Sequence, residues 1–164
     1  MATTRKTTDY TGRKVDILAF NGSFSDKQFQ LDQSLYNKTQ TSGLVCAGIQ
    51  KLAQRWAIEF LTPLGSMPYL ETRGSSFLND VRSGKLRTEL DATVSFNYAR
   101  DQVADNLRLE DNSGTYPDDE KYAGAELLAV NVVQGSKITL SVQINSIAGS
   151  SRVFVVPVAV VPAR

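Results

Sequence analysis

Apolar residues recur at helical spacing between residues 45 and 60. The stripe consists of Val45, Ile49, Leu52, Ala53, Trp56 and Phe60. Steps of three and four residues place these side chains on one face of a helix. The polar residues between them are expected mostly on the solvated side; they are Gln50, Lys51, Gln54, Arg55 and Glu59. Thr41 and Ser42 are candidate caps, and Pro63 ends the helix because proline disfavours helical geometry at the residue before it.

Two further helices are predicted before residue 108. A short one covers residues 77–83, with Ser75 or Ser76 as its cap and Gly84 as its stop. A longer one covers residues 86–107, with an apolar stripe that consists of Leu86, Leu90, Val94, Ala99, Val103 and Leu107. Residues 108–125 are polar and carry Gly114, Pro117 and Gly124, so they are expected to form a loop.

The hydrophobic pattern changes to a period of two in the last third of the chain. Ile138, Leu140, Val142 and Ile144 alternate with polar residues, which predicts a strand that is buried on one face. Residues 126–134 and 152–161 predict strands on either side, joined by turns at residues 135–136 and 148–151. Another short strand is expected at residues 14–21, with extended or irregular structure at 24–43.

These elements predict an α+β fold, in which a helical N-terminal half packs on a small antiparallel C-terminal sheet. No internal repeat or strong linker divides the chain, so a single domain is expected over residues 14–164. Residues 1–13 are polar, rich in threonine and basic, and are expected to form a flexible arm.

The last predicted strand is almost wholly apolar, but it contains Pro157 and is followed directly by Pro162. Proline lacks the amide donor that a central strand needs, so the strand is expected at a sheet edge or a bulge. Such an edge is a candidate surface for adding a strand from a partner, through Val153, Phe154, Val155, Val156, Val158 and Val160. Alternatively, the strand packs on its own domain and the prolines only protect that edge from aggregation.

The composition of the chain excludes several kinds of active site and gives no support for some kinds of partner. The net charge of +1 gives no support for a nucleic-acid or membrane partner. The absence of histidine removes Ser-His-Asp and Cys-His nucleophile systems and histidine metal sites. A single cysteine, Cys46, forms no intrachain disulfide and is expected to be a small core residue. With no apolar signal segment or membrane-length run, we expect a soluble protein made in a cytoplasm. Neither a cofactor nor a metal is expected.

Carboxylates provide the alternative to a structural role. Glu59, Glu71, Asp80, Glu89 and Asp91 surround the helical segments, and a pair of them is conceivable in a small hydrolase of cell-wall glycan. Glu59, Glu71 or Glu89 is then the candidate acid. The acidic stretch from Asp111 to Glu120 is either a cation site with oxygen ligands or, as we expect, a solvated charge cluster.

Two turn segments carry a family likeness. They are Leu61-Thr62-Pro63-Leu64-Gly65-Ser66 and Arg73-Gly74-Ser75-Ser76-Phe77-Leu78. Together with the order of strand, helices and β-meander, they resemble the lysozyme-like baseplate wedge proteins, or sheath initiators, of contractile phage tails. The likeness covers roughly residues 14–160, and its specific part is the turn motif Thr62, Pro63, Gly65, Ser66, Gly74 and Ser75. Many members carry a Glu-Pro-Arg triplet after the long helix, whereas residues 106–110 here contain no proline.

The resemblance implies a structural protein of the virion and no enzyme. It implies several copies in a symmetric ring of the tail baseplate. The helical half is then expected to pack on other wedge proteins or the hub. The C-terminal sheet is expected to exchange strands with the first ring of tail sheath protein and to nucleate sheath assembly.

Overall fold

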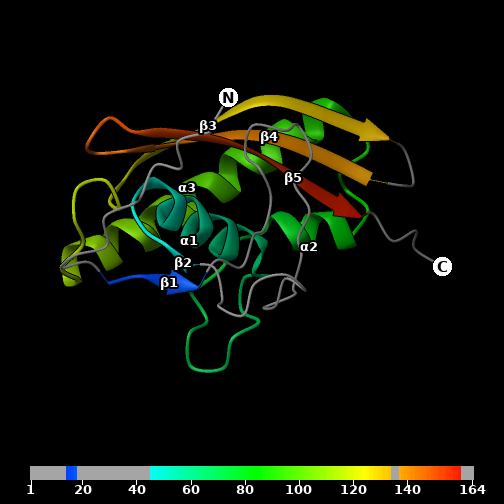
Figure 1. Cartoon of the computed structure of the whole chain (residues 1–164). Helices are drawn as coiled ribbons and strands as arrows, with labels where there is room; N and C mark the ends of the chain where they lie inside the picture. The colour runs from blue at the N-terminus through cyan, green and yellow to red at the C-terminus, as the bar shows by residue number, and fades with distance from the viewer. Residues whose placement is uncertain (1–13, 18–44, 134–136, 160–164) are drawn as a thin grey trace, which may run out of the picture.

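A layer of helices covers one face of an antiparallel sheet in the computed structural model of the chain (Figure 1). The structure describes residues 14–17, 45–133 and 137–159. Its helices are α1 (Ile49–Leu61), α2 (Phe77–Arg82) and α3 (Glu89–Ser113). Its strands are β1 (Asp16–Ile17), β2 (Val45–Cys46), β3 (Tyr122–Val133), β4 (Lys137–Ser146) and β5 (Ser151–Ala159). The helices precede the sheet along the chain, and the predicted α+β class is confirmed.

Helix α1 begins later than the apolar pattern predicts. Val45 belongs to β2, which pairs antiparallel with β1, so its assignment to the helical stripe is wrong. Gly48 makes the change from strand to helix with a φ of 63°, a conformation that glycine adopts without steric cost. The helix ends at Leu61, directly before the extended Thr62 and Pro63, as predicted. Thr41 and Ser42 lie outside the described residues, as do the arm 1–13 and the segment 18–44.

Helix α3 is longer than predicted and buries a different stripe. A capping box between Thr88 and Asp91 starts the helix three residues after the predicted start, at Glu89, and the helix continues to Ser113. Leu90 and Val94 are 72% and 62% exposed, so their assignment to the buried stripe is wrong. The buried face follows Ala92, Phe96, Ala99, Val103 and Leu107, whose steps of four, three, four and four residues form a regular helical stripe around Phe96. The predicted loop at 108–125 is also wrong at both ends, because α3 and β3 occupy parts of it.

The sheet has the strand order β3-β4-β5, with β4 in the middle and both pairings antiparallel. Ile138, Leu140, Val142 and Ile144 of β4 are fully buried, as the period of two predicts. Residues 134–136, where a hairpin turn is predicted, lie outside the described part. The turn between β4 and β5 is present and uses Gly149 at a φ of 80°.

An aromatic cluster joins the two layers. The ring of Trp56 stacks on Phe60 with centroids 4.7 Å apart, and Phe154 of β5 meets Trp56 edge-on at 5.8 Å. Phe96 of α3 lies 5.5 Å from Phe60. Because α1, α3 and β5 each contribute to this cluster, the last strand is an integral part of the core.

Candidate functional site

The predicted partner-binding strand is at the edge of the sheet. β5 pairs with β4 along Ser151–Ala159, and no other described strand pairs with it. Its side chains alternate, with Phe154, Val156 and Val158 buried. The side chains of these three residues pack in the chain's own core, so they are not available to a partner, and strand addition at these positions stays a prediction about the backbone edge.

Two members of the predicted set remain available on β5. Val153 is 39% exposed, and Val155 is partly exposed on the same face. Val160 lies outside the described residues. Among the described strands only β4 pairs with β5, and Val153 and Val155 are the members of the predicted set that point away from the core.

The turn motif closes a loop through contacts between residues 62–64 and Ser75, which we call the neck of the loop. The N–H of Leu64 donates to the carbonyl of Ser75 (2.9 Å), and the N–H of Ser75 donates to the carbonyl of Thr62 (2.8 Å). Pro63 and Ser75 form an isolated parallel bridge, and the Ser75 hydroxyl donates to the carbonyl of Phe60 (2.6 Å). The residues that the sequence presents as two separate turns are thus neighbours. We call the loop that they enclose, residues 63–74, the finger.

Gly74 fixes the geometry of this neck. Its φ of 94° is a conformation that side chains rarely adopt, and a Cβ there would lie 2.4 Å from the carbonyl oxygen of Thr62. Gly65, at a φ of 75°, has open space around it, so it matters for the backbone conformation alone. Glycine at both positions of the motif is explained by the closed loop.

A buried carboxylate holds the finger to α1. Glu59 is 3% exposed, and one of its oxygens accepts from the Gly74 N–H (2.8 Å) and the Asn106 amide (2.7 Å). Its other oxygen lies 2.8 Å from Nη2 of Arg73. Asn106 also donates to the carbonyl of Thr72 (3.1 Å). The prediction that Glu59 lies on a solvated helix face is wrong, because the finger and α3 cover it.

The ion pairs continue from the finger to the end of α3. Arg73 also pairs with Glu110, which in turn lies 2.8 Å from Arg55 of α1. Arg55 contacts Asp111 as well (3.0 Å), and its guanidinium lies 4.2 Å from the centroid of the Tyr116 ring. Burial raises the pKa of Glu110, but the hydrogen bonds from Arg55 and Arg73 outweigh this and hold its pKa below the ordinary value.

A second buried pair fastens the loop before β3. Lys51 of α1 lies 2.9 Å from Glu120, and the other oxygen of Glu120 accepts from the Gly48 N–H (3.0 Å). Glu120 is 1% exposed and Asp111 is paired with Arg55, so the expectation of a solvated acidic cluster at 111–120 is wrong for these two residues. Among the described residues no group of three or more acidic or cysteine side chains is placed to hold a metal ion.

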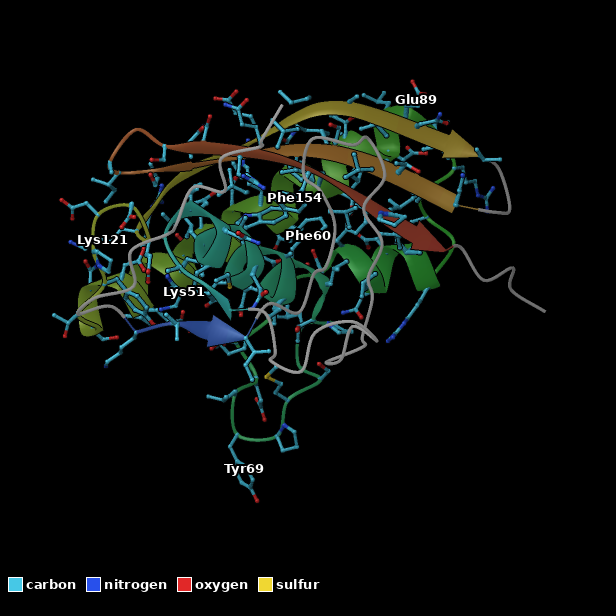
Figure 2. The ribbon with its side chains drawn as sticks, viewed as in Figure 1. Lys51, Phe60, Tyr69, Glu89, Lys121 and Phe154 are labelled. Atoms are coloured by element: carbon cyan, nitrogen blue, oxygen red, sulfur yellow. The ribbon has the colours of Figure 1, made fainter. Side chains whose placement is uncertain are left out.

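The candidate acids do not form a site together. The three oxygen contacts of Glu59 are structural, while Glu71 and Glu89 are exposed. Figure 2 shows Glu89 at the sheet side of the molecule and Tyr69, two residues before Glu71, at the opposite side. A pocket of about 390 Å³ between α3 and β3 is lined by other residues, among them Arg100, Asp105, Arg108 and Tyr122. Cys46 is buried as predicted, and burial raises the pKa of its thiol to about 11.

Sequence reasoning missed two features of this region. The ion-pair network of Arg55, Arg73 and Glu110 left no signal, because its members come from three segments far apart in the chain. The apolar content of the finger did leave one: Leu64, Met67, Tyr69 and Leu70 crowd into seven residues punctuated by Gly65 and Pro68. Large apolar residues are unusual in an exposed, glycine- and proline-marked turn.

Comparison of the chain with protein-family models, with curated proteins and with solved structures finds no match. None of the helices in the described part of the chain has the length and apolar character needed to span a membrane.

Proposed function

We propose that this chain is a structural component of a contractile phage tail baseplate. It joins the wedge and hub proteins to the first sheath ring and nucleates sheath assembly. Several copies of the chain form a symmetric ring in the baseplate. Its location is then the virion, and it acts without catalysis. The turn motif at residues 62–66 and 73–76, with its likeness to sheath initiators, supports this assignment.

The observation that carries the proposal is the position of β5. It is the edge strand of the sheet, and its inward side chains anchor it in the core. An edge strand that is held this firmly presents its outer backbone groups in a fixed register. That is what a template for strand addition requires.

The arrangement of the carboxylates supports a role without catalysis. Glycan hydrolysis needs two carboxyl groups a few ångströms apart with room for the substrate between them. Glu59 instead accepts two hydrogen bonds and pairs with Arg73, and it is buried beneath the finger. Its charge and its hydrogen-bonding capacity are already used within the protein.

The test must leave the core intact, because removal of β5 would also remove Phe154, Val156 and Val158. A Val153→Lys/Val155→Lys double variant adds charge to the outward positions of the edge and disfavours strand pairing there. Val133→Lys on β3, the opposite edge strand, is the matched control, because Val133 is 43% exposed.

Polymerisation of purified sheath protein is measured after addition of each variant. We expect the β5 double variant to fold with an unchanged melting temperature and to fail to nucleate sheath, while the Val133→Lys control nucleates normally. Normal nucleation by the double variant would contradict the proposal.

A further inference from the structure

The finger projects from the helical layer on the side opposite the sheet (Figure 1). Its tip, which we define as Met67, Tyr69 and Leu70, is apolar and exposed. Leu70 is 54% exposed and Tyr69 fully exposed, and Figure 2 shows the Tyr69 ring pointing away from the protein. The Tyr69 ring therefore receives no packing energy from the described part of its own domain.

Tyr69 has a positive φ angle, which is unusual for a residue other than glycine or asparagine. The N–H of Leu70 donates to the carbonyl of Met67 (3.2 Å), which closes a turn with Pro68 and Tyr69 at its centre. Tyr69 has a φ of 68°, so the turn has the φ pattern of type II, in which glycine or asparagine is favoured at this position. A tyrosine there carries a strain of about 1–2 kcal/mol. No contact of a fully exposed ring within the described residues offsets this strain.

The base of the finger is held to the helices by ion pairs and hydrogen bonds. Arg73 is paired with Glu59 and Glu110, and the Thr72 carbonyl accepts from Asn106. The neck hydrogen bonds between Thr62, Leu64 and Ser75 close the other side. Because the base of the finger is fixed, less conformational entropy is lost when a partner binds the protruding side chains. This favours a binding role for the tip.

We propose that the finger tip inserts into an apolar cleft on a different protein, with Tyr69 as the central anchor. This surface is separate from β5, and the proposal goes beyond the role in sheath nucleation and stands without it. Tyrosine is among the residues that most often dominate binding energy, because it combines a large apolar ring with a hydroxyl.

The charge on the finger favours one kind of partner over another. Between Pro63 and Thr72 the finger carries a single charged residue, Glu71, which is exposed and makes no ion pair with the described residues. The guanidinium of Arg73, the nearest cation to Glu71 along the sequence, is used by Glu59 and Glu110. A membrane surface, which favours basic residues around an inserted apolar group, is therefore a poor match. The cleft we infer has a lysine or arginine at its rim.

The pocket between α3 and β3 is lined by four charged residues, Arg100, Asp101, Asp105 and Arg108, besides Ala104, Tyr122, Gly124 and Ala125. Its charges make this pocket a poor receptor for an apolar tip from a second copy of the chain. The partner that we infer is a protein of different sequence, and the cross-linking experiment tests for a second copy.

Photo-cross-linking tests this inference. The full chain carries p-benzoylphenylalanine in place of Tyr69 in the cells that produce it, and the matched control carries it in place of Tyr98, an α3 residue that is 64% exposed. We expect an adduct from position 69, absent from position 98, that peptide mapping places in an apolar cleft with a basic rim on another protein. A Leu70→Ser change in the same chain should abolish it.

Affinity for the mapped protein completes the test. Tyr69→Asn should weaken binding by about 30-fold, while Tyr98→Asn should leave it within twofold. An adduct to lipid or to a second copy, no adduct, the same adducts from both positions, or an adduct that survives Leu70→Ser would each overturn the inference. Sheath nucleation reports on β5, so failure of one proposal is distinguishable from failure of the other.

Discussion

Nη2 of Arg73 lies 2.8 Å from the buried carboxylate of Glu59, which ties the end of the finger to the face of α1. The same carboxylate accepts the Gly74 N–H, so one side chain holds both the backbone and a side chain of the finger. The buried network thereby fixes a loop whose outermost side chain, Tyr69, is fully exposed.

Glu59→Gln should lower the free energy of unfolding by about 3 kcal/mol, because it leaves the partly buried Arg73 without one of its two partners. Glu71→Gln, on the exposed part of the finger, is the control and should change it by less than about 0.5 kcal/mol. Urea unfolding monitored by circular dichroism measures both. Equal, small effects would show that Glu59 is not a structural anchor.

Gly74→Ala should be more damaging than Gly65→Ala. Both positions have positive φ, but only at Gly74 would the new Cβ collide with a backbone oxygen, at 2.4 Å from Thr62. We expect a loss of roughly 3 kcal/mol for Gly74→Ala and about 1 kcal/mol for Gly65→Ala. Thermal unfolding of the two variants checks this order, and a reversed order would contradict the described neck.

Stability should fall on acidification through the Glu110 carboxyl. Its folded-state pKa is held below the ordinary value of 4.5, so its contribution is complete above about pH 4.5 and disappears as the pH falls through the folded-state pKa. In Glu110→Gln the corresponding part of the pH dependence should be absent. Melting temperatures between pH 3 and pH 7 compare the two proteins, and parallel curves would mean that the Arg55 and Arg73 contacts do not stabilise the charged form.

Tyr69→Asn should leave the protein as stable as before or raise its free energy of unfolding by up to about 1 kcal/mol. Asparagine tolerates the positive φ of this turn position, and the replaced ring makes no contact that folding depends on. Chemical denaturation gives the value. A marked loss of stability would mean that the tyrosine has a structural role within its own chain.

The regular patterns of the sequence were predictive where packing involves one face of one element. The alternation of β4 identified its buried residues, and Pro63 marked the end of α1. Prediction failed where partners come from distant segments. Lys51 and Glu59 were assigned to a solvated face, but Glu120 and the finger bury them. The stripe of α3 was misplaced because Phe96 was left out of it.

For the edge strand β5, too, the sequence predicted the position of the element but not the contacts that it makes with other segments. Its prolines and apolar residues predicted a place at the sheet margin, and β5 is an edge strand. Which of its side chains face the core depends on the register with β4, where Val142 is opposite Phe154 and Leu140 opposite Val156. That register separates the outward Val153 and Val155 from the buried positions.

An electron-microscopy map of the tail particle that contains this chain tests the central claim most directly. The proposal predicts density for the chain beneath the first sheath ring, with a strand of the sheath protein paired along the outer edge of β5. A map in which the chain lies elsewhere, or in which the edge of β5 faces solvent, would contradict it.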